Sequence, residues 1–279
     1  MTACLVCHAI DAEPLYRGLL TRCRRCRYVW ADVALTPADV ARLYGRAYFH
    51  GDEYGDYLAD RSTLEKNFAL RLRTLERYLT PSHRRLFEIG SAYGLFLNTV
   101  RERFETVAGI DIFEEGVAFA RGELGLEVTH GDFLSADIRG PYDVVCAWDT
   151  IEHLQRPDAY LAKAAALMPP GGIIAVTTGD IASLNARVRG SRWRLIHPPT
   201  HVHYFSVQTL TRLLDGCGFD VVHQEHCGFY RSLGNMMHNI VALGWGRRAL
   251  GERLRRSVVG RWHLYMNLFD IMYVIARRR

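Results

Sequence analysis

A short glycine-containing loop between an apolar strand and an apolar helix constrains the fold of this chain more than any other feature. Residues 84–97 read RRLFEIGSAYGLFL, in which a strand-like run ends just before Gly90 and apolar residues resume at helical spacing after Gly94. Glycine lets the backbone turn tightly and approach a ligand, and the start of the helix presents unpaired N–H groups. The segment predicts a strand–loop–helix unit that binds a small ligand.

This loop differs from the one that holds a dinucleotide. A dinucleotide-binding fold requires G-x-G-x-x-G around the pyrophosphate, whereas Ala92 stands here in place of a middle glycine and Glu88 precedes the loop. A carboxylate in that place would repel a pyrophosphate, but it suits a ligand with a cationic amino-acid group. The sequence therefore favours a ligand with a cationic amino-acid group over a dinucleotide.

Acidic residues stand at the ends of three further predicted strands. ETVAGID ends at Asp111, LEVTHGDF carries Asp132 and Phe133, and YDVVCAWD ends at Trp148 and Asp149. Helical segments separate these strands, and the alternation predicts a doubly wound parallel sheet. The strand ends would face one ligand, where Asp111 suits two ribose hydroxyls and Asp132 suits an adenine amine.

Together these motifs resemble those of class I S-adenosylmethionine-dependent methyltransferases. The resemblance covers residues 86–219 and rests on FEIGSAYG, AGIDIF, HGDF, YDVVCAWDTIEHLQRP and LMPPGG. WDTIEH and HPPTHVHYF are similar to the small-molecule O-methyltransferase branch, which includes the ubiquinone-pathway enzymes. The implied fold is α/β, a Rossmann-like doubly wound sheet with an antiparallel last strand, here NLFDIMYVIARRR, and the implied cofactor is S-adenosylmethionine.

The resemblance also implies a role for each matching residue. Glu88, Gly90 and Gly94 would line the methionine and ribose part of the cofactor, and Asp111 would bind the ribose hydroxyls. The sulfonium methyl would pass in line to a nucleophile of the acceptor, so that positioning supplies much of the rate. The residues implied around the adenine and the sulfonium are Ile112, Asp132, Phe133, Trp148 and Asp149.

A hydroxyl acceptor needs a base, and three histidines are candidates. His153 follows the fourth strand and is the first candidate, because its strand end also faces the methyl donor. His201 and His203 alternate about Val202, so both are expected to point into one pocket from an extended chain. The alternative role for His153 is packing against the sheet.

A divalent-metal site is a less favoured prediction. Asp149, Glu152 and His153 have the spacing of the Glu-x-x-Glu-His group that resembles a metal site in ubiquinone-pathway methyltransferases. Mg²⁺ held there could lower the pKa of a bound catechol. Aspartate in place of the first glutamate shortens the reach of that ligand by one methylene.

Four cysteines near the N-terminus have the spacing of a structural zinc site. They form two C-x2-C pairs with fifteen residues between them: Cys4, Cys7, Cys23 and Cys26. Two tight turns of this kind supply four thiolates for tetrahedral zinc and leave no position for water or substrate. Disulfides are the alternative, but the N-terminus carries no secretory signal, which favours a reducing cytoplasm. A redox C-x2-C would explain only one pair.

Composition and charge narrow the class of protein. The 279 residues are 49% hydrophobic and 23% charged, as in ordinary globular proteins, and no apolar run reaches the ~20 residues of a membrane span. The net charge of +5 comes from residues 246–279, which contain nine arginines and two acidic residues, a net charge of +7. The rest of the chain therefore has a net charge of −2, and we do not expect a nucleic-acid partner. Leu250, Leu254, Val258 and Trp262 predict a basic amphipathic helix over the substrate pocket, with contact to an anionic membrane as the alternative.

We expect three segments along the chain. These are a zinc-ribbon module at 1–34, a helical lid or linker at 35–80, and the methyltransferase domain at 81–279 with an insert at about 231–262. The ribbon and the aromatic segment that follows it at residues 48–57 resemble those of bacterial methyltransferases acting on sugars and natural products. We predict O-methylation of a hydroxyl of a small molecule, sugar or glycoconjugate. The alternatives are C-methylation of a keto-sugar, base methylation of rRNA and a non-catalytic scaffold.

Overall fold

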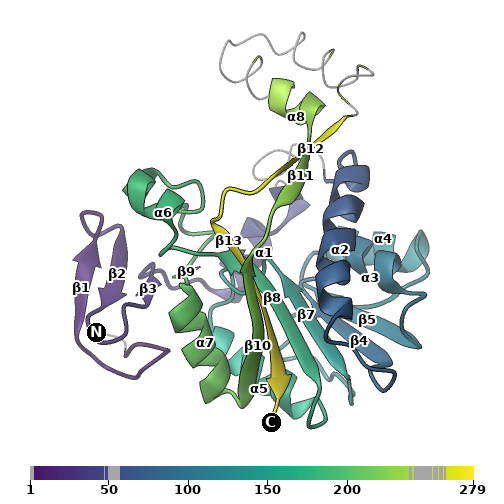
Figure 1. Cartoon of the computed structure of the whole chain (residues 1–279), viewed down its shortest axis with the longest axis horizontal. Coiled ribbons are helices and arrows are strands. Elements are labelled where there is room, and N and C mark those ends of the chain that lie inside the picture. The colour runs from purple at the N-terminus through teal and green to yellow at the C-terminus, as the bar shows by residue number, and fades with distance from the viewer. Residues whose placement is uncertain are drawn as a thin grey trace.

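A seven-stranded sheet forms the centre of the computed structural model, which describes residues 3–46, 48, 49, 57–238, 241, 253, 257, 260 and 262–279 (Figure 1). The strand order is β10-β13-β8-β7-β4-β5-β6. The bounds are β4 Arg85–Ile89, β5 Thr106–Asp111, β6 Glu127–His130, β7 Val144–Trp148, β8 Ile173–Gly179, β10 Phe219–His226 and β13 Ile271–Arg278. Strands β4 to β8 pair in parallel, and β13 is antiparallel to both β8 and β10. The predicted α/β sheet with an antiparallel last strand is confirmed.

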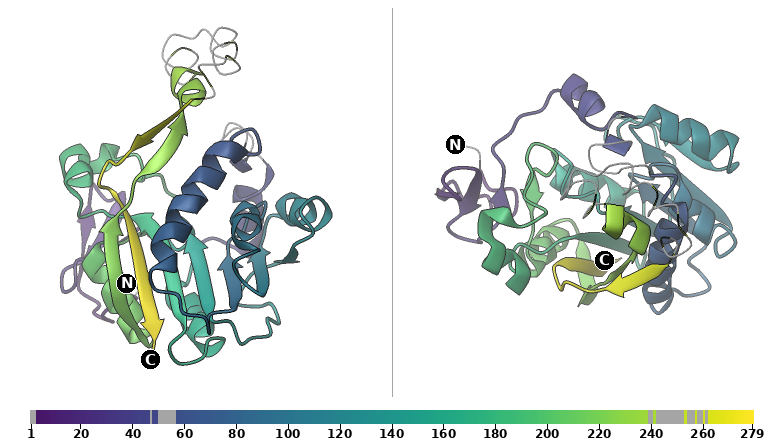
Figure 2. Two further views of the ribbon diagram at one scale, coloured as in Figure 1. Left: turned by 45° about the vertical axis from the view of Figure 1, so that its right-hand side comes forward. Right: turned by 90° about the horizontal axis from the view of Figure 1, so that it is seen from above.

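Helices cover both faces of this sheet (Figure 2). One face packs against α2 Arg61–Glu76, α3 Leu95–Val100 and α4 Glu114–Gly122, and the other packs against α5 Pro157–Ala166 and α7 Val207–Gly216. Neighbouring strand residues alternate between the two layers, as Leu86 and Phe87 do in β4. Burial on both faces explains why these strands read as continuous apolar runs.

The strand order reverses at β4, whose two neighbours, β5 and β7, both follow it in the sequence. In an open parallel sheet, ligands bind beyond the carboxyl ends of the strands at such a reversal. Gly90 follows β4, Asp111 ends β5 and Asp149 follows β7. The topology therefore brings these three predicted ligand residues to one edge of the sheet.

The N-terminal residues form a small antiparallel sheet that includes a strand from a distant part of the chain. Strands β1 Ala12–Leu15, β2 Leu20–Cys23 and β3 Val29–Trp30 are followed in the sheet by β9 His203–Tyr204. The backbone N–H of Ala31 also donates to the carbonyl of Val202 at 2.9 Å. Pairing with β9 joins the predicted ribbon to the rest of the protein. The three predicted segment boundaries stay predictions.

The remaining elements lie outside the two main sheets. Helix α1 Pro37–Leu43 begins with Thr36 as its N-cap and proline in its first turn. Strand β11 Phe229–Ser232 pairs with β12 His263–Met266 in a two-stranded antiparallel sheet. This small sheet extends beyond the main sheet, with α8 Leu233–His238 at its far end (Figures 1 and 2). Helix α6 Leu184–Arg189 precedes a 3-10 turn, Gly190–Arg192.

The predicted amphipathic helix with Leu250, Leu254 and Val258 falls outside the described residues. Within the part of the chain that the structure describes, none of the helices combines the length and the apolar character needed to cross a membrane.

The buried side chain of Asp270 fixes the segment before β13, and its contribution to stability can be tested. It is 1% exposed and accepts hydrogen bonds from Asn185 Nδ2 at 2.8 Å, Trp193 Nε1 at 2.9 Å and Arg194 Nη2 at 3.1 Å. Asp270→Ala should lower the free energy of unfolding by about 2–4 kcal/mol, because it leaves a buried N–H and a cation without their acceptor. Urea unfolding followed by circular dichroism measures this change. The exposed Asp137→Ala should change it by less than about 0.5 kcal/mol, and equal losses would contradict the prediction.

Candidate functional site

The loop after β4 adopts the backbone that its glycines predicted. Gly90 and Gly94 have positive φ angles of 76° and 71°. A Cβ atom at Gly90 would lie 2.6 Å from Thr150 Oγ1, so space as well as φ excludes a side chain there. Ala92, in place of the missing glycine, also has a positive φ of 46°, which is strained for a residue with a Cβ atom. The loop thus follows a glycine-type path despite the alanine.

The carboxylate of Asp111 ties this loop to the end of β5. Its Oδ2 accepts from the backbone N–H of Ala92 at 2.7 Å, and its Oδ1 accepts from that of Phe113 at 2.8 Å. Burial raises the pKa of Asp111, and the amide hydrogen bonds oppose that shift. Each carboxylate oxygen keeps a second lone pair, which suits the two hydroxyls of a ribose. Ile112, predicted to pack on an adenine, is half-buried beside it.

Glu88 has an unsatisfied carboxylate oxygen at the same edge. It is 2% exposed, and its Oε2 has no hydrogen-bond partner among the described residues; the same is true of Ser91 Oγ in the loop. Burial, with a further contribution from Asp111, raises the pKa of Glu88 well above its usual range. Buried polar atoms of this kind are costly unless a ligand completes their hydrogen bonds. The loop therefore fits a cofactor that carries hydroxyl and ammonium groups.

Asp132 and Phe133 follow β6 as predicted, but their side chains are engaged within the protein. Asp132 accepts from the hydroxyl of Tyr160 and, at 3.1 Å, from the backbone N–H of Ser135. The ring of Phe133 packs in the core against Phe87 and Tyr160, with centroid distances of 5.7 and 5.6 Å. Contact of this pair with an adenine stays a prediction.

Trp148 and Asp149, at the end of β7, have different surroundings. The ring of Trp148 is buried against Tyr273, with centroids 5.4 Å apart, so its contact with a sulfonium stays a prediction. Asp149 has a positive φ of 49° and accepts from Thr177 Oγ1 at 2.9 Å. It also accepts from Arg71 Nη2 of helix α2 at 2.6 Å, and this ion pair holds its carboxylate at the sheet edge.

A cluster of imidazoles lies beside the end of β7. The rings of His153 and His201 have centroids 4.5 Å apart, and His197 lies 3.9 Å from His201. Nδ1 of His153 is 2.9 Å from the carbonyl of Thr200, and Nδ1 of His201 is 2.9 Å from that of Leu195. A carbonyl can only accept, so we assign the ring proton to Nδ1 in both histidines, which leaves the lone pair on Nε2.

Burial determines the charge of this cluster. It lowers the pKa of His153 to about 4 and that of His201 to about 2, so both rings are neutral near pH 7. Glu152 is 3% exposed, and burial followed by the charge of Asp149 raises its pKa to about 8. Tyr44 covers one side of the cluster, with its ring edge-on to His153 at 5.4 Å. Neutral imidazoles in such surroundings can accept a proton or ligate a metal.

His203 does not join this cluster, although we expected it to share a pocket with His201. It lies in β9, where its Nδ1 is 2.5 Å from the hydroxyl of Tyr28 in the N-terminal module. We expected this because residues two positions apart in an extended chain, such as His201 and His203, point to the same side. The N–H groups of Val202 and His203 instead both donate to the carbonyl of Glu152, at 2.9 and 3.1 Å, so the chain is bent at this point.

The four N-terminal cysteines have the geometry of a zinc site. Their Sγ atoms all lie within 4.8 Å of one another: Cys4, Cys7, Cys23 and Cys26. Two of the Sγ–Sγ distances are 3.5 Å, close to the ~3.8 Å edge of a tetrahedron with Zn–S bonds of about 2.3 Å. All seven cysteines of the chain are free rather than disulfide-bonded. The thiols therefore fit a single tetrahedral ion.

A second group with metal-ligand geometry differs from the predicted one. Ligand atoms of Glu152, His153 and His201 lie within 4.8 Å of one another, whereas Asp149 is absent from this group and is paired with Arg71. Two imidazoles and one carboxylate suit a transition-metal ion better than Mg²⁺, which prefers oxygen ligands. Sequence spacing identified two of these three residues.

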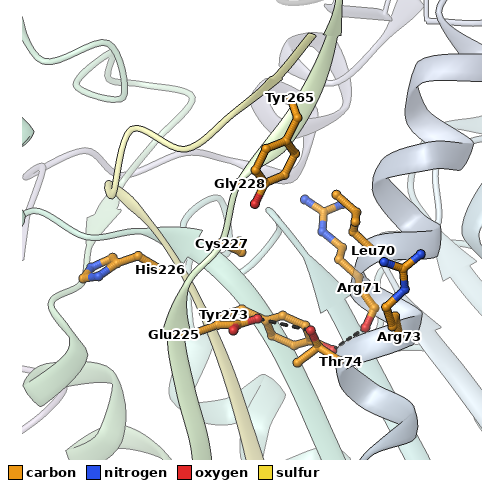
Figure 3. A pocket seen from close by; sticks show the side chains of 10 residues that line it. All are labelled: Leu70, Arg71, Arg73, Thr74, Glu225, His226, Cys227, Gly228, Tyr265 and Tyr273. Atoms are coloured by element: carbon orange, nitrogen blue, oxygen red, sulfur yellow. Dashed lines mark hydrogen bonds between the residues drawn. The ribbon is translucent and has the colours of Figure 1, made fainter. Parts of the chain in front are cut away.

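A pocket of about 210 Å³ opens between α2 and the end of β10 (Figure 3). Figure 3 shows that Arg71, Glu225 and Tyr265 approach this pocket from three different elements. Because Arg71 also binds Asp149, the pocket lies next to the end of β7. The full lining is Leu70, Arg71, Arg73, Thr74, Glu225, His226, Cys227, Gly228, Tyr265 and Tyr273.

Sequence reasoning missed three residues of this site: Arg71, Tyr44 and His197. The histidine spacing in HPPTHVH is a signal that could identify His197. Arg71 and Tyr44 carry no comparable signal, because their partners Asp149 and His153 are 78 and 109 residues away in the sequence.

Comparison with known proteins gives one family match and distant relatives. A family described as "Methyltransferase domain" matches residues 57–224, more than half of the chain. A ubiquinone biosynthesis O-methyltransferase of Caulobacter sp. strain K31 is 30% identical over 161 residues, which are 52% of this chain and 64% of the relative. The chain thus spans slightly less than two thirds of that curated relative's length.

Solved structures share the fold at low sequence identity. The cyclase SpnF matches with a TM-score of 0.51 at 19% identity, covering 76% of this chain and 80% of its own. Phosphoethanolamine N-methyltransferase 2 of Haemonchus contortus matches with a TM-score of 0.53 at 14% identity, covering 84% of this chain and 60% of its own. These names differ in activity, so the fold by itself does not assign one. By the match over residues 57–224, the chain belongs to the methyltransferase domain family.

Proposed function

We propose that this protein is an S-adenosylmethionine-dependent methyltransferase that O-methylates a hydroxyl of a small molecule, sugar or glycoconjugate. The observation that carries the proposal is one sheet edge that combines the unsatisfied Glu88 and the amide-bound Asp111 with the neutral imidazoles of His153 and His201. The relatives named as ubiquinone biosynthesis O-methyltransferases support transfer to oxygen.

The residues of this edge divide into a binding group and a proton-transfer group. When bound, S-adenosylmethionine supplies an activated methyl group. Asp111 would hold the ribose hydroxyls and Glu88 the polar groups of the methionine part. His153 would accept the proton of the acceptor hydroxyl on Nε2, which frees an oxygen lone pair for in-line attack. Tyr44 would exclude water from one side of His153.

The pocket beside Arg71 is our candidate for the acceptor site. The guanidinium of Arg71 and the hydroxyl of Tyr265 are donors, and the carboxylate of Glu225 is an acceptor that already receives a hydrogen bond from Thr74 Oγ1 at 3.2 Å. Donors and acceptors around one small space suit a ring with several hydroxyls. C-methylation of a keto-sugar would use the same base and pocket to enolise a ketone.

The protein has two candidate metal sites among the described residues. The four N-terminal cysteines would hold structural zinc, and a cytoplasmic location would keep their thiols reduced. The group Glu152, His153 and His201 supports a second candidate mechanism. These residues would hold a divalent ion, whose charge would lower the pKa of the acceptor hydroxyl and replace the imidazole base.

Cofactor binding can be tested by calorimetry with S-adenosylmethionine and S-adenosylhomocysteine. We expect micromolar binding of both and no binding of NAD. Asp111→Ala should weaken binding about 100-fold, because two hydrogen bonds to a charged group are lost. Asp143→Ala is the matched control, since Asp143 also accepts from two backbone amides but lies at the opposite edge of the sheet. Equal effects of the two variants would contradict the assigned cofactor site.

The raised pKa of Glu88 predicts a pH-dependent gain in stability for Glu88→Gln without cofactor. Above the unfolded-state pKa of about 4.5, the unfolded chain releases a proton that the folded protein retains, so the wild type loses stability as pH rises. The variant should gain on the wild type by about 1.4 kcal/mol per pH unit above that point, up to the folded pKa, while binding S-adenosylmethionine more weakly. Urea unfolding at pH 5, 6 and 7 measures this gain; parallel stability curves would disprove it.

The acceptor class and the base can be tested in one assay. Tritium transfer from methyl-labelled S-adenosylmethionine should reach a hydroxylated small molecule in a panel of 3,4-dihydroxybenzoate, nucleotide-activated hexoses and ribosomal RNA. His153→Asn should lower the rate about 10²- to 10⁴-fold and leave S-adenosylhomocysteine binding intact, as expected for a lost general base. Transfer to RNA alone would favour the rRNA alternative, and an unchanged rate in the variant would exclude His153 as the base.

A further inference from the structure

Tyr28 connects the cysteine loops to the segment that carries the site histidines. It lies two residues after Cys26 and is 1% exposed. Its carbonyl accepts from the backbone N–H of Cys23 at 2.8 Å, and its hydroxyl is 2.5 Å from Nδ1 of His203. One residue is therefore hydrogen-bonded to a metal-ligand loop at its backbone and to β9 through its side chain.

The path continues from β9 to the histidine cluster. The N–H groups of Val202 and His203 both donate to the carbonyl of Glu152, at 2.9 and 3.1 Å. The carboxyl group of Glu152 lies with the imidazoles of His153 and His201. A shift of β9 would thus move both the backbone of Glu152 and the neighbouring His201.

Pairing of the two sheets reinforces this path. Strand β3 pairs with β9 in the register Val29 with Tyr204 and Trp30 with His203. The ring of Tyr28 packs against Phe205, just after β9, with centroids 5.6 Å apart. The bent segment from His201 to His203 therefore depends on the N-terminal module for contacts on one side, because the module supplies the strand beside it.

We propose that the metal-loaded N-terminal module positions the 197–203 loop, and that Tyr28 is the positioning residue that transmits this effect to His201 and Glu152. The inference rests on the proposed function, which gives the four cysteines a metal and the histidines a role. The cofactor residues Glu88 and Asp111 lie on β4 and β5, and neither of these strands pairs with β9. Loss of metal or of the Tyr28 hydroxyl should therefore disturb the histidines without disturbing cofactor binding.

Tyr28→Phe tests the path without removing the ring from the core. Hydrogen exchange at the amides of Val202 and His203 should become about tenfold faster, which corresponds to the loss of one buried hydrogen bond. Zinc content by elemental mass spectrometry and S-adenosylhomocysteine affinity should stay unchanged. Tyr16→Phe is the matched control, because Tyr16 belongs to the same module but its hydroxyl makes no hydrogen bond among the described residues.

Imidazole NMR signals distinguish positioning from a general loss of stability. In Tyr28→Phe, the ¹⁵N and ring-proton signals of His201 and His203 should shift, while those of the distant His83 and His130 should not. Removal of the metal with a chelator should speed exchange in residues 3–30 and 197–203 and leave β4 and β5 unchanged.

The proposal is overturned if the chelator loosens the module but leaves exchange at 197–203 unchanged, or if Tyr28→Phe matches Tyr16→Phe in exchange and in the His201 signal. Failure of the proposed function has a different signature. Absence of zinc from the purified protein would contradict the proposal that the four cysteines hold a metal. Absence of S-adenosylhomocysteine binding would contradict the proposed cofactor. In either case, the comparison of Tyr28→Phe with Tyr16→Phe still tests the connection from Tyr28 to His201.

Discussion

Three acids gathered at one edge of a parallel sheet, among which Glu88 is buried, are the constraint on which the rest of this site depends. The carboxyl ends of β4, β5 and β7 meet there, and they carry Glu88, Asp111 and Asp149. A buried carboxylate beside another acid is costly to ionise, and Glu88 is in this position next to Asp111. Arg71 pairs with Asp149 and two backbone amides bind Asp111, but Glu88 keeps an oxygen without a partner among the described residues. A ligand that supplies hydrogen-bond donors would satisfy this oxygen.

The histidine cluster depends on a different part of the chain. Its loop is bonded on one side to Glu152 and on the other to the N-terminal sheet, in which β9 is the last strand. Backbone hydrogen bonds on two sides hold the loop in a bent path that an isolated segment would not keep. The small cysteine-containing sheet thus borders, through β9, the residues that would handle the acceptor proton in the proposed mechanism.

Local chemistry accounts for the parts of the site that could be predicted from the sequence. Positive φ angles favour glycine at Gly90 and Gly94, and Asp111 stands at the end of a strand, so each signal is contained within a few residues. The same is true of the paired cysteines, whose spacing already places their thiols together. Phe133 and Trp148 show the limit of this reasoning, because a residue at a strand end can direct its ring into the core.

The sequence by itself determined the α/β class, the backbone of the glycine-containing loop after β4, the edge where the acids meet and the cysteine cluster. Only the tertiary structure decided which side chains complete the site. Arg71 reaches Asp149, and His203 turns to Tyr28 rather than to His201, across separations of 78 and 175 residues. These contacts depend on how helix α2 and the N-terminal sheet pack against the central sheet. Local periodicity describes the direction of a side chain only while the backbone stays regular, and the bend at 201–203 breaks that condition.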